Sequence, residues 1–440
     1  MKQQNNKRFI LAIILSCLSI AGYAQELTPY KLSLEQAVEM GMKNHQQLKM
    51  SQARLDAVEQ QVSVSKSQRL PSVSFSANAF YLGDAVILDA DWSKVQTVEM
   101  PHFGNTFGLQ ASQLLYKGGV IKKSIEVAEL QHQLAAFDLV ANEQEIKFLI
   151  ISYYLDIKKL LNQTQVLEQN KTLAEQLLAN VTKLYEEDMV TRNELIRSEL
   201  QIKNLDQSIL TMKNAHAILS NQMSYALGLP NDILFIPVED VETDMLYQPQ
   251  TYYSDKARHK HPALQTAERN VAIAEKNVGI QKSNWFPALS AFGGYNMQRP
   301  ITSSTPAVDM YSNAWQVGLS LSFNLDNFYK NSRQVNLSKS QVRVTQEAYI
   351  YTQQNIEIGI NSAYRKYQEA EQQVLLVNDS KKLANENYEI IKDKYLNQLA
   401  ITAEMTDASN AKLKAELEYA NAVINAVFQY YNLLKSSGTL

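Results

Sequence analysis

Two carboxylates near the C-terminal end of the sequence, Glu404 and Asp407, have a spacing that places both side chains on one face of a helix. Such a pair could serve acid–base chemistry or form a negative patch that attracts cations. Carboxylates are abundant along this chain, so their pairing alone does not indicate catalysis. The alternative is that Glu404 and Asp407 belong to an ordinary solvated helix face.

Histidines provide the other candidate chemistry. His259 and His261 flank Lys260 in a polar stretch that lacks cysteine, which favours a surface position over a metal site. His216 occupies an apolar helical stripe, where a hydrogen-bonded packing role is expected. The sequence has no HExxH, no GxSxG and no phosphate-binding loop. We therefore expect no enzyme, no catalytic residue, no cofactor and no metal.

The first 24 residues have the pattern of a secretory signal peptide. Lys2, Lys7 and Arg8 precede an apolar run, and small residues lead to a predicted cleavage after Ala24. The single cysteine, Cys17, falls inside this segment; lipidation at Cys17 is a less favoured alternative. The formal net charge of −3, without a basic patch, argues against nucleic acid as a partner.

The remaining sequence contains an internal duplication. A shift of 216 residues aligns His45 with His261 and Pro71 with Pro287, and from Leu109 onward the shift is 210. The change of shift falls between the strand segments, in a link that we expect to be a surface loop. The predicted organisation is a signal peptide (1–24), a first repeat (25–235) with a β-hairpin at 71–116, a linker (236–255), and a second repeat (256–440) with a β-hairpin at 286–325.

Alternating residues interrupt the helical pattern twice in each repeat. In "LPSVSFSANAF", which starts at Leu70, residues 72–79 place apolar side chains at odd positions and polar side chains at even ones, and "WQVGLSLSFNL" from Trp315 has the same alternation. Segments of about ten alternating residues with aromatic ends are typical of outer-membrane strands. A strand of a soluble sandwich alternates equally well, but two matched hairpins in a secreted, mostly helical chain favour the membrane.

The helical segments are too long for a single globular core. Residues 120–187 contain neither proline nor glycine, and no proline follows Asp326. At about 1.5 Å per residue, 65 helical residues would extend roughly 100 Å, which indicates coiled coil. Apolar residues spaced by three and four, as in Ile202, Leu205 and Ile209, are the seams of such helices.

These elements together predict an oligomeric wall. Four strands cannot close a barrel, because about eight are needed, and a sheet in lipid cannot leave an edge unpaired. The hairpins should therefore join those of other copies, with the helices continuing the same wall in water. The predicted fold is mainly α, with long antiparallel coiled-coil helices and a β-barrel portion to which each chain gives four strands.

The chain resembles the TolC-like outer membrane efflux protein family. The resemblance rests on "LSLEQAVEMGMKNHQQL", "LPSVSFSANAF", "WFPALSAFGGYN", "SYALGLP" and the helical turns "YEEDMVTRNELIRSEL" and "YLNQLAITAEMTDASNAKL", which occur in the family's order. It implies a homotrimer with a trimeric α-barrel, continuous with a 12-stranded outer-membrane β-barrel. The implied partners are a periplasmic adaptor protein, an inner-membrane transporter and outer-membrane lipid, and the implied location is the outer membrane, extending into the periplasm.

In this family the two helical turns form a periplasmic aperture lined by aromatic and acidic residues. The positions that match here are Tyr185, Glu194, Tyr395, Glu404 and Asp407. A threefold copy would place six carboxylates from Glu404 and Asp407 in one narrow ring, which would favour cations.

The turns also depart from the family pattern. Where relatives often carry Gly-Leu, this chain has Asp188-Met189 and Gln398-Leu399, and Ala400 stands where some members use an arginine to hold the aperture shut. The arginine that holds the aperture shut in those members is therefore absent at this position.

The resemblance implies a passive exit duct of a tripartite efflux pump for small molecules. One alternative is the outer-membrane component of a type I protein secretion system. A second alternative is a coiled-coil envelope scaffold that is not a channel, but the paired hairpins argue against it. A third is a periplasmic hydrolase with an unrecognised site.

Overall fold

The computed structural model describes residues 28–239, 248–304 and 307–440. The predicted signal peptide, Cys17 and residues 240–247 of the predicted linker lie outside the described residues. The helices are α2 (Leu34–Asn44), α3 (Gln46–Ser67), α4 (Val120–Glu186), α5 (Arg192–Leu227), α6 (Gln250–Lys260), α7 (Pro262–Lys282), the 3-10 helix η1 (Ser283–Trp285), α8 (Asn327–Leu396) and α9 (Thr402–Ser436). The strands are β1 (Thr28–Leu32), β2 (Ser72–Tyr81), β3 (Ala85–Leu88), β4 (Lys94–Val98), β5 (Phe103–Tyr116), β6 (Ile233–Pro237), β7 (Ala288–Arg299) and β8 (Ser312–Ser322).

The chain folds into two compact units, each built from both halves of the sequence. The first unit comprises Met1–Gln52, Leu139–Pro262 and Gln353–Leu440, described from residue 28 onward, and the second comprises Ala53–Asp138 and Ala263–Thr352. The helices α4 and α8 each contribute to both units. The division into two sequence repeats stays a prediction.

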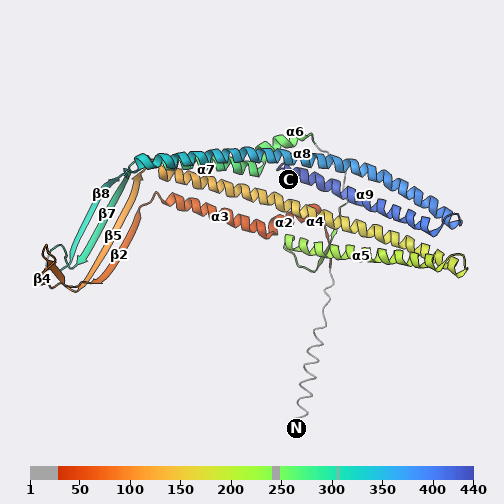
Figure 1. Ribbon diagram of the computed structural model, residues 1–440, viewed down its shortest axis with the longest axis horizontal. Coiled ribbons are helices and arrows are strands. Elements are labelled where there is room, and N and C mark those ends of the chain that lie inside the picture. Colours follow the sequence, from red (N-terminus) through yellow and green to blue (C-terminus); the bar gives the residue numbers. More distant parts are fainter. Residues whose placement is uncertain (1–27, 240–247, 305–306) are drawn as a thin grey trace, which may run out of the picture. The chain divides into compact units, whose positions relative to one another are not determined.

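The second unit contains a four-stranded antiparallel sheet in the order β2-β5-β7-β8 (Figure 1). These are the four strands that the alternating pattern predicts. A row of aligned residues, Phe75, Leu109, Tyr295 and Trp315, crosses all four strands. Because side chains alternate along each strand, the register gathers the apolar positions on one face and the Ser, Thr, Asn and Gln positions on the other.

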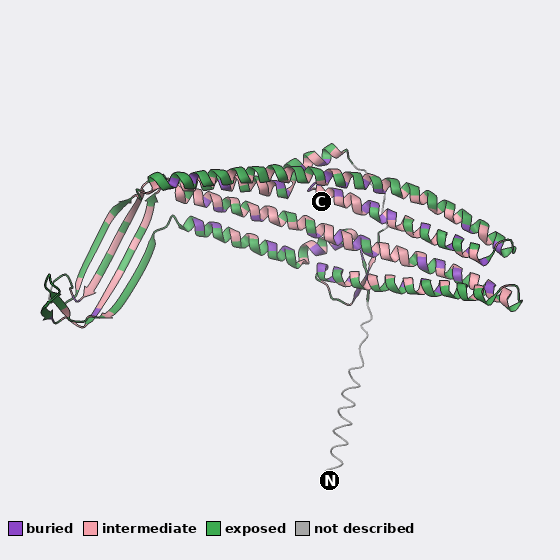
Figure 2. Ribbon diagram, in the orientation of Figure 1, coloured by how far each residue is buried: buried purple, intermediate pink, exposed green. Residues whose placement is uncertain are grey.

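The apolar face of this sheet is exposed in the single chain. Phe75 is 71% exposed, Trp315 is 75% exposed and Val317 is 74% exposed. Figure 2 shows the outer strands mostly in the colour of exposed residues. A face this apolar across four strands is stable only when lipid or protein covers it.

Two aromatic residues, Phe292 and Phe80, occupy positions on the otherwise polar face of the sheet, and each ring lies over a glycine of the neighbouring strand. Phe292 is aligned with Gly318, and a side chain added at Gly318 would meet the Phe292 ring at 3.0 Å. Phe80 covers Gly104 in the same way in the first hairpin. The aromatic rings fill the gaps left by the glycines, a device that stabilises sheets. This explains the irregular position of Phe292.

The link between β2 and β5, which the sequence predicts as a surface loop, is mostly exposed but also contains two short strands. Residues 85–98 form an antiparallel ribbon of β3 and β4, in which Ala85 is aligned with Val98. The segment does not alternate between polar and apolar residues, and nearly all of its side chains are exposed on both faces of the ribbon.

In the first unit, the long helices pack as the seams predict. Leu167 and Ala174 of α4 meet Ile202, Leu205 and Ile209 of α5 in one buried cluster. Ion pairs reinforce the same pair of helices: Lys171 contacts Asp206 at 2.7 Å, and the hydrogen bond to Asp206 raises the pKa of Lys171. Among the described residues, no helix is both long and apolar enough to cross a membrane.

The first unit also contains a parallel pair of strands, β1 and β6, that the sequence analysis did not predict. Phe235 of β6 is 1% exposed. On the side of β6 away from β1, side chains of α5 form hydrogen bonds with the backbone N–H and carbonyl of Phe235. His216 Nε2 donates to the Phe235 carbonyl at 2.7 Å, and the Phe235 N–H donates to Ser220 Oγ at 3.2 Å. His216 is thus a hydrogen-bonded packing residue, as predicted.

The helix predicted before each hairpin is interrupted at the paired histidines. His45 separates α2 from α3 and His261 separates α6 from α7, each with an extended backbone at the helix end. Pro262 explains the second break, because proline disfavours helical backbone at the preceding residue. At the first break, the N–H of Gln47 donates to His45 Nδ1 at 3.2 Å.

Candidate functional site: the two helical turns

The turn between α4 and α5 and the turn between α8 and α9 have the same backbone geometry. Asp188 and Gln398 adopt left-handed φ values of 58° and 60°. In the first turn, Asp188 N–H donates to the Tyr185 carbonyl at 3.0 Å; in the second, Gln398 N–H donates to the Tyr395 carbonyl at 3.0 Å. These bonds satisfy carbonyls at the helix ends and reverse the chain within five residues.

One hydrogen bond ties the two turns together. Thr402 Oγ1, at the start of α9, donates to Glu194 Oε2, near the start of α5, at 2.8 Å. Thr402 is 2% exposed. Glu194 was predicted from the sequence and Thr402 was not, because no local pattern connects residues separated by 208 positions.

Glu404 has a different, local interaction. Its Oε2 accepts from the Ile401 backbone N–H at 3.3 Å, and its own N–H donates to the Ile401 carbonyl at 3.1 Å. A carboxylate in the first turn of a helix also interacts favourably with the helix dipole. Glu404 therefore stabilises the start of α9 and remains exposed.

Tyr395 is buried between the turns. It is 6% exposed and belongs to an apolar cluster with Val181, Tyr388 and Met405. Its hydroxyl has no hydrogen-bond partner among the described residues. Beside it lies a cavity of about 210 Å³ that Glu194, Thr402 and Gln398 also line. The structure thus brings two of the predicted residues, Glu194 and Tyr395, to one cavity.

Asp407 lines a second cavity, a groove of about 550 Å³ between α5 and α9. Its wall is mostly polar on the α5 side, with Arg197, Asn204 and Ser208, and it ends on Leu413 and Leu417 of α9. Tyr185 lines neither of these two cavities and is half-buried.

The five predicted residues therefore form three groups within one chain. Glu194 and Tyr395 share the inter-turn cavity, Asp407 lies in the groove, and Tyr185 and Glu404 lie outside both. Within the ranges that the structure describes, no group of three or more His, Cys, Asp or Glu side chains could hold a metal ion.

Comparisons with known proteins agree with the fold. Residues 38–229 and 253–439 match the outer membrane efflux protein family. No curated protein sequence matches the chain. Among solved structures, the chain is similar to the outer-membrane channel OprN (TM-score 0.78, 16% identity, covering 92% of this chain and 90% of that one).

Two further channels have the same fold. The outer membrane protein VceC from Vibrio cholerae gives a TM-score of 0.75 at 14% identity, with 92% of this chain and 96% of that one covered. The CmeC outer membrane channel from Campylobacter jejuni gives a TM-score of 0.73 at 16% identity, with 92% of this chain and 85% of that one covered. With the family match extending over most of both sequence halves, this chain belongs to the outer membrane efflux protein family, a family of channels rather than enzymes.

Proposed function

We propose that three copies of this chain form one duct that conducts small molecules passively from the periplasm to the exterior. The exposed apolar face of the four-stranded sheet carries this proposal. β2 and β8 are the two edges of that sheet, and each has one side without a strand partner among the residues that the structure describes. Lipid cannot satisfy those backbone groups, so copies of the chain must pair edge to edge. A coiled-coil scaffold in water would have no use for such a face.

Exposed apolar stripes on the helices support assembly from copies. On α8, Leu337 and Val344 are 66% and 58% exposed, and Tyr351 and Ile358 continue the stripe at 65% and 67%. These four residues are spaced seven apart. A stripe with this period is a coiled-coil seam that needs a partner helix. On α3, Met50 and Val64 begin and end a similar stripe, at 65% and 57% exposed.

The helical turns are proposed as the periplasmic gate. Tyr185, Glu194, Tyr395, Glu404 and Asp407 would lie around the aperture in three copies. The exposed positions of Glu404 and Asp407 support a ring of carboxylates facing water. The bond between Glu194 and Thr402 would hold the turns together, and its rupture would accompany opening.

The proposed partners are a periplasmic adaptor and an inner-membrane transporter, which would supply the energy. Adaptor binding near the two turns would bias them toward opening.

Disulfide cross-linking tests the assembly. On a Cys17→Ser background, Ser74→Cys in β2 and Ser320→Cys in β8 place thiols on the two edge strands. Oxidation of the purified membrane form should give covalent dimers and trimers and nothing larger. The control pair Ser74→Cys/Ser290→Cys puts the second thiol on the interior strand β7 and should not link copies. Monomers alone, or a ladder beyond three, would contradict the proposal.

A further inference from the structure

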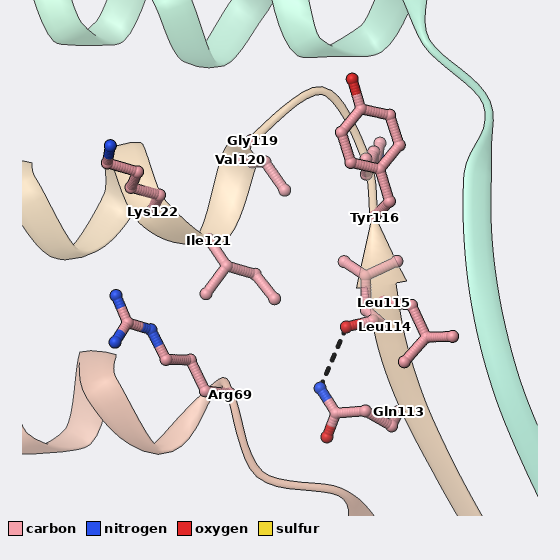
Figure 3. A pocket seen from close by; sticks show the side chains of 10 residues that line it. Arg69, Gln113, Leu114, Leu115, Tyr116, Gly119, Val120, Ile121 and Lys122 are labelled. Atoms are coloured by element: carbon pink, nitrogen blue, oxygen red, sulfur yellow. Dashed lines mark hydrogen bonds between the residues drawn. The ribbon is translucent and has the colours of Figure 1, made fainter.

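A cavity in the second unit lies where β5 ends and α4 begins, close to the end of α3 (Figure 3). Its volume is about 380 Å³. Gly118 and Gly119, with φ values of 55° and 74°, let the chain turn sharply there from strand into helix. The turn brings Lys117 and Lys122 to a cavity whose other wall includes Arg69.

The positive charge around this cavity is only weakly neutralised. Arg69 and Lys117 form no ion pair with any part of the chain that the structure describes. Lys122 reaches Glu126 only at 4.0 Å, while the same carboxylate binds Lys276 at 2.8 Å. Three cations with one distant, shared carboxylate leave a site that favours an anion.

The opposite wall of the cavity is apolar. Leu114 and Leu115 at the end of β5 and Val120 and Ile121 at the start of α4 line it (Figure 3). Tyr116 lies at the rim and is 49% exposed; its ring meets that of Phe286 edge-on at 6.3 Å. Aromatic rings of this kind concentrate at membrane–water interfaces. The cavity therefore combines cations, an aromatic rim and an aliphatic wall, which suits a ligand with an anionic head and an apolar tail.

We propose that this cavity binds the phosphate of a phospholipid headgroup, with Arg69, Lys117 and Lys122 around the phosphate and the acyl chain along Leu115 and Ile121. The proposal rests on the function proposed above, because it takes the apolar face of the sheet to lie in lipid. The sheet ends next to the cavity, so the headgroup region of one leaflet would meet this site. Bound phospholipid would fix the height of the chain in the membrane.

Native mass spectrometry of the full-length protein released from nanodiscs tests the site. Nanodiscs made of phosphatidylcholine with an equal share of phosphatidylglycerol supply the probe. The wild-type protein should retain phosphatidylglycerol at least about fivefold over phosphatidylcholine. Arg69→Gln/Lys122→Gln should lose most of that preference, and Arg69→Lys/Lys122→Arg, which keeps both charges, should restore it.

The matched control is Lys339→Gln/Arg343→Gln, which removes two exposed cations from α8 that do not line the cavity. It should retain phosphatidylglycerol as the wild type does. Equal retention of both lipids by the wild type, or an equal loss in the control variant, would overturn the proposal. Displacement of the lipid by millimolar inorganic phosphate alone would also overturn it, because the site would then bind free phosphate.

A channel assay separates this inference from the proposed duct. Arg69→Gln/Lys122→Gln should still form conducting trimers in planar bilayers. If those channels conduct while the wild type shows no lipid preference, the lipid site is wrong and the duct stands. If the wild type forms no channel, the proposed function itself fails.

Discussion

The hydroxyl of Thr402 donates a 2.8 Å hydrogen bond to the carboxylate of Glu194 and so joins two helical turns that lie 208 residues apart in the sequence. A hydrogen bond to a charged acceptor contributes about 1.5–3 kcal/mol, and about 1.4 kcal/mol changes an equilibrium tenfold. Loss of this single contact would therefore shift the equilibrium between joined and separated turns by about tenfold or more.

If the turns form the proposed periplasmic gate, Thr402→Val should weaken its closed state. Valine keeps the shape of threonine but cannot donate, and Glu194 would be left without this donor. We expect the open probability of single channels in planar bilayers to rise about tenfold or more.

Thr406→Val is the matched control for this gate. The Thr406 hydroxyl donates to the Thr402 carbonyl within α9 and links no second turn. Its channels should open as the wild type does. If Thr402→Val and Thr406→Val behave alike, the bond to Glu194 has no part in gating.

Glu404→Gln/Asp407→Asn should reduce cation selectivity. In three copies the change removes six negative charges near the proposed aperture, and each contributes a fraction of a kcal/mol to a passing cation in water. The ratio of cation to anion permeability, from reversal potentials in a salt gradient, should fall about threefold or more.

Removal of two exposed carboxylates elsewhere provides the control for charge. Glu347→Gln/Glu357→Gln changes the middle of α8, away from both turns. That variant should keep the wild-type permeability ratio. An unchanged ratio in Glu404→Gln/Asp407→Asn would mean that these carboxylates lie on a solvated face and not at a constriction.

Gln398→Gly should stabilise the second turn by about 1 kcal/mol, because a side chain in left-handed backbone is strained and glycine is not. Asp188→Gly should stabilise the first turn less, since Asp tolerates this conformation better than Gln. Thermal unfolding of the purified protein in detergent measures both effects.

Asn397→Gly tests whether the gain depends on backbone conformation. Asn397 precedes the left-handed residue, and its side chain donates to the Asp393 carbonyl at 2.8 Å. Glycine at position 397 removes this hydrogen bond and makes the unfolded backbone more flexible, so the midpoint temperature of thermal unfolding should fall. If Asn397→Gly raised the midpoint temperature as much as Gln398→Gly, backbone strain at Gln398 would not be the cause of the stabilisation.

The burial of His216 predicts a pH-dependent stability of the first unit. Burial lowers the pKa of His216, so the folded protein favours the neutral ring. The stabilisation is present above the unfolded pKa of about 6.5 and is lost as the pH falls below it, when the unfolded chain takes up a proton that the folded chain resists.

Hydrogen exchange at Phe235 measures this effect. The exchange protection of its amide, which donates to Ser220, should fall as the pH is lowered from about 7 to 5, after correction for intrinsic exchange rates. His216→Ala leaves the buried Phe235 carbonyl unpaired and should cost about 1–3 kcal/mol. His216→Gln, which can donate but does not titrate in this range, should flatten the pH dependence. Burial also lowers the pKa of His45 and His261, which gives a residual slope of the same sign.

The strands of the main sheet and the long helices could be predicted because their signals are local. Alternation in "SVSFSANAF" requires only neighbouring residues, and the apolar face that it predicts is the one the register forms. The β1–β6 pair could not be predicted in this way. Thr28 is aligned with Ile233 across more than 200 residues, and a parallel pair has no turn to announce it.

The site was predicted only in part for the same reason. Family resemblance selected Glu194 and Tyr395, and the structure places both beside one cavity. No sequence motif predicts Thr402 as the partner of Glu194 or the cationic cavity at Arg69. Each of these features is formed by residues from separate segments of the chain.

The sequence by itself determined the alternating strands and the long helices, and with them the membership of the outer membrane efflux protein family. Tertiary structure decided which side chains meet: Thr402 with Glu194, His216 with Phe235, and Arg69 with Lys117 and Lys122 around one cavity. The reason is that the period of a strand or helix is set by backbone geometry over a few residues. Contacts between distant segments depend on how whole elements pack.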